Sequence, residues 1–201
     1  MATNILHADS ISRGRVLAYL TIGWNSLEAI IAVTAGILAG SIALVGFGFD
    51  SVIEVSSGAI ILWRLFAGEH REKLALKLVG FSFLALTAYI LFDAVKSLWF
   101  REPPETTYVG IAVAALSLVV MPLLARAKRK VAVNLDSRAM HADSRQTDLC
   151  AYLSAILLGG LILNAVFGWW WADPVAALIM VPIIAKEGID ALRGETCDDC
   201  H

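Results

Sequence analysis

The sequence has little charge, little cysteine and no sign of a cleaved leader. Only 17% of the 201 residues are charged. The net charge of -2 argues neither for nor against nucleic acid, and we expect no nucleic-acid partner. The three cysteines do not suggest a disulfide framework. The N-terminal residues lack the basic start and small-residue cleavage site of a secretory signal peptide, so the first apolar run is kept as a span.

What the sequence does contain is hydrophobic residues in long runs. They make up 58% of the chain, and the mean hydropathy is +0.72, which is too apolar for a soluble domain of this size. Runs that approach the roughly 20 residues needed to cross a bilayer predict an all-α, polytopic membrane protein with six transmembrane helices. These runs cover about 16–39, 42–66, 74–100, 107–125, 136–168 and 174–192.

The positions of Lys and Arg predict the orientation. Of 16 such residues, only Lys96 and Arg101 fall near the side reached after the first, third and fifth runs. Both termini should therefore be cytoplasmic, in a cell membrane such as a bacterial inner membrane. We expect a cytoplasmic segment at 1–13, a six-helix domain at 14–193 and a short cytoplasmic tail at 194–201.

The second run carries the clearest candidate site. Asp50 and Glu54 lie one helical turn apart, so they share one face of a helix. Two acids at membrane depth repel each other and are costly to desolvate, so they persist only where a cation, a proton or a basic partner offsets them. We therefore expect them to bind a metal ion.

A second polar cluster opens the fifth run. His141, Ser144 and Asp148 follow each other at steps of three and four and share a helical face, whereas Asp143 points off it. At about 1.5 Å of rise per residue, Glu54 and Asp148 both come out near mid-bilayer. The two pairs could then face each other and supply the four ligands of a tetrahedral zinc site, although such ligands also suit manganese, iron or cadmium.

Other polar positions are open to two interpretations. Asn25 and Glu28 share a face of the first run and are either a second shell or proton path, or polar contacts between helices. Asp93, on the third run, is either part of the same path or an interfacial hydrogen-bonding residue. Cys197, Cys200 and His201 form a tail that is either without consequence or captures a soft metal.

Taken together, these motifs resemble the cation diffusion facilitators, proton-coupled exporters of zinc and related divalent ions. The resemblance rests on Asp50-Ser-Val-Ile-Glu54, on Ser144-Arg-Gln-Thr-Asp148 and on six spans with both ends inside. It implies that Asp50 and Glu54 are the ligands of the second helix, with Glu in place of the usual Asp. It also implies that Asp148 is the acid of the fifth helix. Ser144 stands where the family has His, and Asp143 or His141 are alternatives.

The resemblance also implies a function. It predicts an exporter of a zinc-like divalent cation that has no fixed cofactor. Protons are the expected coupled ion, and the metal is the cargo. The usual C-terminal cytoplasmic domain is not expected here, so a homodimer would form through membrane helices. The alternative is a membrane metal-binding or regulatory protein that does not transport. An intramembrane enzyme is not expected, because the sequence has neither a His-Glu-x-x-His pair nor a longer Asp-rich signature.

Overall fold

The computed structural model describes residues 2–67, 72–101, 104–135 and 138–193. Within them the fold is entirely helical, which confirms the expected all-α class. The elements in chain order are α1 (Ala2–Ala39), α2 (Ile42–Ala67), α3 (Glu72–Phe100), α4 (Tyr108–Leu135), α5 (Arg138–Phe167) and α6 (Ala172–Arg193).

Five of the helices are long and apolar enough to cross a membrane. The qualifying stretches lie in α1, α2, α3, α4 and α5, and in the described residues α6 does not meet the same criterion. A helix satisfies its own backbone hydrogen bonds, so it is one of the few structures that lipid tolerates. The chain is therefore a multi-pass membrane protein, and the sixth crossing remains a prediction.

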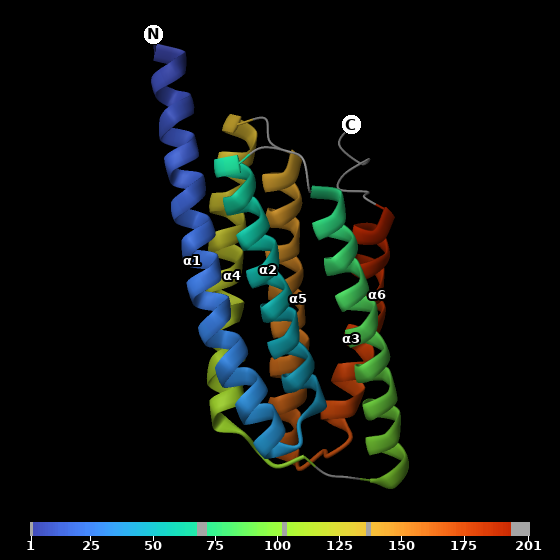
Figure 1. Ribbon diagram of the computed structural model, residues 1–201. Coiled ribbons are helices and arrows are strands. Elements are labelled where there is room, and N and C mark those ends of the chain that lie inside the picture. Colours follow the sequence, from blue (N-terminus) through green and yellow to red (C-terminus); the bar gives the residue numbers. More distant parts are fainter. Residues whose placement is uncertain (1, 68–71, 102–103, 136–137, 194–201) are drawn as a thin grey trace.

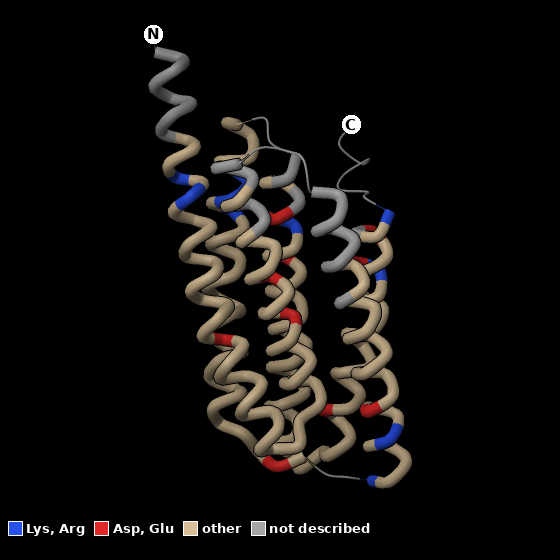
Figure 2. Tube along the Cα trace, viewed as in Figure 1, with Lys and Arg blue, Asp and Glu red and all other residues tan. Residues whose placement is uncertain are grey.

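The helices form one elongated bundle, with α2 in its middle (Figure 1). Helix α1 packs against α2 and α4, α4 packs against α5, and α3 pairs with α6, while α2 contacts α1, α3, α5 and α6. The first residues of α1 and the last residues of α6 lie at the same end of the bundle (Figure 1). Lys and Arg gather mainly near that end (Figure 2).

The opposite end is tied together by one buried carboxylate. Asp173 of α6 accepts a hydrogen bond from Ser41 Oγ and another, of 2.9 Å, from the backbone N–H of Ile42. Both donors lie at the start of α2, where the first N–H groups have no partner inside the helix. The α1–α2 turn reaches this position through Gly40, whose φ of 64° suits glycine. Asp173 therefore fixes the start of α2, and with it the depth of Asp50 and Glu54.

Candidate functional site

The centre of the candidate site is a lysine that the sequence pattern had assigned to a topology signal. Helix α4 continues to Leu135, ten residues beyond the expected end of the run at Ala125. Lys128 is therefore still on the helix, and its side chain is 0% exposed. Its neighbours on the buried stripe of α4 are Gly110, Ala114, Ser117, Met121, Ala125, Val131 and Ala132.

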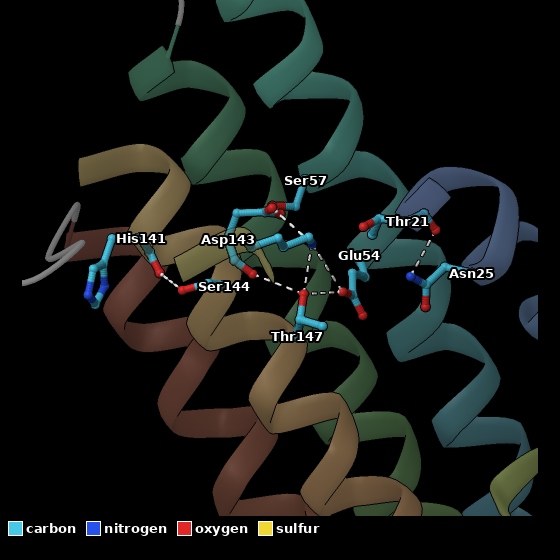
Figure 3. Close-up of polar contacts among 9 residues, drawn as sticks. Thr21, Asn25, Glu54, Ser57, His141, Asp143, Ser144 and Thr147 are labelled. Carbon is cyan, nitrogen blue, oxygen red and sulfur yellow. Dashed lines mark hydrogen bonds and ion pairs between the residues drawn. The ribbon is translucent and has the colours of Figure 1, made fainter. Parts of the chain in front are cut away.

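Glu54 of α2 lies close to Asp143 and Thr147 of α5 (Figure 3), and the Lys128 ammonium contacts all three. Its Nζ lies 2.9 Å from Asp143 Oδ2 and 3.7 Å from Glu54 Oε1, and it donates a 2.8 Å hydrogen bond to Thr147 Oγ1. Thr147 in turn donates a 2.6 Å hydrogen bond to Glu54 Oε1. We call Glu54, Lys128, Asp143 and Thr147 the lysine cluster. It joins α2, α4 and α5.

The two oxygens of Glu54 have different surroundings. Oε1 is held by Thr147 and Lys128, whereas Oε2 is buried and has no hydrogen-bond partner among the described residues. A buried carboxylate oxygen without a partner is costly. Such an oxygen is available to a ligand, and the fixed Oε1 sets its direction, as an outer hydrogen-bonding partner does for a metal ligand.

Asp50 and Cys150 lie on the other side of Glu54. The Cys150 thiol is fully buried and lies close enough to the Asp50 and Glu54 carboxylates to interact with both electrostatically. Asp50 also lines a narrow pocket with Gln146 of α5 and Glu187 of α6. The Nε2 atom of Gln146 has no partner among the described residues. Two carboxylates, one thiol and one amide thus lie in neighbouring positions on α2 and α5.

The inward face of α5 differs from the expected one. Asp143, Thr147 and Cys150 face α2, at steps of four and three, so the expected stripe through His141, Ser144 and Asp148 is not the one that meets Glu54. Asp143, which was expected to point away, contacts the lysine that contacts Glu54.

The other residues expected on α5 lie away from the cluster. Asp148 Oδ2 lies 2.9 Å from Arg129 Nη1, and the two side chains are 26% and 44% exposed. His141 and Ser144 lie on the side of α5 away from Glu54 (Figure 3), where Ser144 donates a 2.7 Å hydrogen bond to the His141 carbonyl. Their role as ligands stays a prediction.

The polar positions on α1 lie close to the site, whereas Asp93 does not share its contacts. Glu28 is buried and accepts a 2.9 Å hydrogen bond from Ser51, the neighbour of Asp50. Asn25 is also buried and donates from Nδ2 to the Thr21 carbonyl at 3.0 Å. Asp93 accepts a hydrogen bond from Tyr89 on its own helix. The tail residues Cys197, Cys200 and His201 lie outside the described residues.

No preformed metal cage is present in the described part of the chain, since no three or more His, Cys, Asp or Glu side chains are gathered in a metal-holding arrangement. The donors around Asp50, Glu54 and Cys150 are neighbours that must move together to share one ion. Their mixture of sulfur and oxygen suits zinc, cadmium or cobalt better than magnesium or calcium.

Sequence reasoning missed four residues of this region: Lys128, Thr147, Cys150 and Gln146. The signal for Lys128 was present, because it continues the buried stripe of α4 at three residues after Ala125. Cys150 could have been found as well, because it lies seven residues after Asp143 and so shares its helical face. Thr147 lies four residues after Asp143 and carries the same signal, whereas Gln146 lies off that face and carries none.

Comparison with known proteins places the chain in a wider group. Residues 18–195 match the family model of the cation efflux transmembrane domain. Transmembrane protein 163 of Xenopus laevis is 29% identical over 182 residues, which are 88% of this chain and 65% of that protein.

Two bacterial relatives match over shorter stretches. A "Cadmium, cobalt and zinc/H(+)-K(+) antiporter" of Bacillus velezensis is 30% identical over 131 residues, 62% of this chain and 40% of the relative. The "Cation-efflux pump FieF" of Shewanella oneidensis is 26% identical over 114 residues, 53% of this chain and 38% of the relative. The chain thus spans less than two thirds of the length of each of these three relatives.

Proposed function

Because the chain belongs to the cation efflux transmembrane domain family, we propose that it exports a zinc-like divalent cation in exchange for protons. The ion is cargo, bound between α2 and α5 by Asp50, Glu54 and Cys150, with Gln146 as the fourth donor. The name of the Bacillus velezensis relative, which includes cadmium, cobalt, zinc, protons and potassium ions, supports the divalent ions and the protons of this proposal.

The observation that carries this proposal is the position of the Cys150 thiol. It is fully buried and neighbours two carboxylates from a different helix. A structural cysteine would gain more from apolar neighbours, since acids next to a thiol leave costly charge in the membrane interior. A thiolate and two carboxylates are instead a donor set for a borderline-soft dication.

The lysine cluster supports the site from one side. Thr147 and Lys128 hold Glu54 Oε1, which leaves Oε2 free for the cation. On the other side, Glu187 lines the same pocket as Asp50 and Gln146. Its carboxylate can bind the cation briefly as the ion passes from the end of α6 to the site. Lys128 thereby orients a ligand without itself touching the ion.

The transport cycle follows from shared ligands. A dication that reaches the carboxylates and the thiol displaces the protons they hold, because close acids titrate as a coupled set and metal binding releases protons. Exposure of the site to the opposite side then lets protons compete the ion off. Six crossings, cytoplasmic termini and a homodimer through membrane helices complete this proposal, with a cell membrane as its location.

Flux measurements test the proposal. The wild type and Asp50→Asn are reconstituted in proteoliposomes with a trapped zinc indicator and a trapped pH dye. Wild-type protein should move Zn²⁺ and protons in opposite directions, and Asp50→Asn should reduce Zn²⁺ flux to the level of empty vesicles. Asp93→Asn is the matched control, because Asp93 hydrogen-bonds with Tyr89 on its own helix and does not share the contacts of Asp50, so flux should be unchanged.

Two results would contradict it. Unchanged Zn²⁺ flux in Asp50→Asn would remove Asp50 from the site. Saturable Zn²⁺ binding by the wild type without any flux would instead indicate the alternative, a membrane metal-binding protein that does not transport.

A further inference from the structure

Helices α1 and α4 come close together near the end of the bundle where Lys and Arg gather (Figure 2). A β-carbon at Gly14 of α1 would lie 3.5 Å from Val131 Cγ1 of α4, and Leu17 packs against the buried cluster that contains Val131. At the opposite end, Glu105, three residues before α4, donates a 2.7 Å backbone hydrogen bond to the Ala39 carbonyl at the end of α1. The two helices are therefore antiparallel, and Gly14 and Val131 mark their contact at the basic end.

One basic residue precedes each of these two contact positions. Arg13 comes before Gly14 and Lys130 comes before Val131, and both basic side chains are exposed. Consecutive residues of a helix are rotated by about 100°, and in antiparallel helices this rotation carries the two preceding residues to the same side of the contact. Arg13 and Lys130 therefore flank the α1–α4 contact on one side. That side is turned away from the bundle interior, where Lys128 is buried.

Arg129, the neighbour of Lys130, is used differently. It points toward α5, where its Nη1 lies 2.9 Å from Asp148 Oδ2, so its charge is balanced within the protein. Lys130 is rotated by about 100° from Arg129, toward α1. Each of the two helices thus brings one cation, Arg13 or Lys130, to the same side of their contact.

Exposed leucines continue from these two cations toward the opposite end of the bundle. On each helix they lie seven and fourteen residues from the cation, which is about two and four turns, so they share its face. These are Leu20 and Leu27 on α1 and Leu116 and Leu123 on α4, each 55–58% exposed. A surface with two cations at one end and apolar side chains along the rest matches a phospholipid, which has a phosphate at one end and acyl chains at the other.

We propose that this side of the α1–α4 pair binds one anionic phospholipid, with the phosphate between Arg13 and Lys130 and the acyl chains along the leucines. The charges decide the class of lipid. A zwitterionic headgroup carries an ammonium that would lie next to two cations, whereas the headgroup of phosphatidylglycerol has no positive charge. Each basic residue beside an anionic lipid should strengthen binding by about fivefold. The site shares no residue with the lysine cluster or with the proposed metal site, so it does not depend on the transport proposal.

Native mass spectrometry of the purified protein in detergent counts the bound lipids and measures their affinity. Phosphatidylglycerol and phosphatidylcholine with the same acyl chains are titrated separately. The wild type should bind the first phosphatidylglycerol about tenfold more tightly than the first phosphatidylcholine, or by more. Glycerophosphoglycerol, which is the same headgroup without acyl chains, should not displace the lipid, because it cannot contact the leucines.

Variants separate this site from a general attraction between anionic lipid and basic residues. Arg13→Gln and Lys130→Gln should each weaken phosphatidylglycerol binding by about fivefold, and the double variant by about 25-fold, while phosphatidylcholine binding stays the same. Lys186→Gln is the matched control. It removes one exposed positive charge from α6, where Lys186 interacts with the nearby acid Glu187, and it should bind phosphatidylglycerol as the wild type does.

Three results would overturn the lipid site. The first is equal affinity of the wild type for the two lipids. The second is a Lys186→Gln variant that loses as much phosphatidylglycerol binding as Lys130→Gln, which would indicate a general charge effect. The third is displacement of the lipid by glycerophosphoglycerol, which would indicate a site for a free anion. None of these results bears on the transport proposal, because Zn²⁺ flux is not part of the measurement.

Discussion

The two sides of Glu54 differ in how their charge is balanced. On one side, Lys128 and Thr147 satisfy Glu54 Oε1 and Asp143 with a cation and a hydroxyl that belong to the chain. On the other side, Glu54 Oε2 has no partner among the described residues. The first side is built to be permanent, and the second is suited to ions that arrive and leave.

The comparison also explains why the lysine does not exclude a metal site. A basic partner that covered both oxygens of Glu54 and also Asp50 would leave no charge for a cargo ion. Lys128 contacts only Oε1 of Glu54 and is held closer to Asp143, at 2.9 Å compared with 3.7 Å. It thereby offsets part of the desolvation cost of the region and leaves Asp50, Glu54 Oε2 and Cys150 available.

The largest expected effect is the loss of folding stability when Lys128 is replaced. Lys128→Met leaves Glu54 and Asp143 buried without their cation, which should cost about 3–5 kcal/mol of folding free energy. Titration with sodium dodecyl sulfate, followed by circular dichroism, measures the loss. Lys128→Met combined with Asp143→Asn should recover part of it, because one unpaired charge is removed. Lys130→Met, at an exposed position of the same helix, should have almost no effect. Equal stability of Lys128→Met and Lys130→Met would contradict the buried ion pair.

The next largest effect is expected on the side of Glu54 that faces Cys150. Cys150→Ser replaces the soft donor with a hard one, so Cd²⁺ affinity should fall by about 10- to 100-fold, or roughly 1.4–2.8 kcal/mol, while Mn²⁺ affinity changes much less. Competition against a fluorescent metal indicator measures both constants. Ser154 offers a control on the same helix. Its hydroxyl donates to the Cys150 backbone carbonyl and not to the thiol, so Ser154→Ala should leave the ratio of the two affinities unchanged.

A smaller effect lies at the boundary between the two sides. Thr147→Val removes the hydroxyl that donates to Glu54 Oε1 and accepts from Lys128, at nearly the same side-chain volume. The loss of these hydrogen bonds should cost about 1–3 kcal/mol of stability. It should also weaken metal binding, since Glu54 is no longer oriented. If metal affinity is unchanged while stability falls, Thr147 serves the fold alone.

The smallest effect is expected at Asp148. Its pair with Arg129 is partly exposed, and such pairs contribute about 0–1 kcal/mol. Asp148→Asn should therefore change stability little and leave Zn²⁺ affinity near the wild-type value. A loss of Zn²⁺ binding as large as that of Asp50→Asn would restore Asp148 as a ligand of the fifth helix.

The helices and the acids of α2 could be predicted from the sequence, because long apolar runs and two carboxylates one turn apart are strong local signals. The partners on α5 could not. They depend on the rotation of α5 about its axis, and the local pattern around Asp143 and Asp148 allows either acid to face inward. Lys128 was hidden because it stands in a basic block with Arg126, Arg129 and Lys130. If helix α4 ended at Ala125, the whole block would be a topology signal. Because the helix continues, Lys128 lies on its buried stripe.

X-ray absorption at the zinc edge tests the central claim most directly. The protein is prepared with Cys197→Ser and Cys200→Ser, so that Cys150 is the only thiol of the three in the sequence, and is loaded with one equivalent of Zn²⁺. The proposed site predicts one Zn–S contact near 2.3 Å with the remaining ligands oxygen or nitrogen near 2.0–2.2 Å, and loss of the sulfur contact when Cys150→Ser is added. A zinc shell without sulfur before that change would contradict the assignment of Cys150, Asp50 and Glu54 to one site.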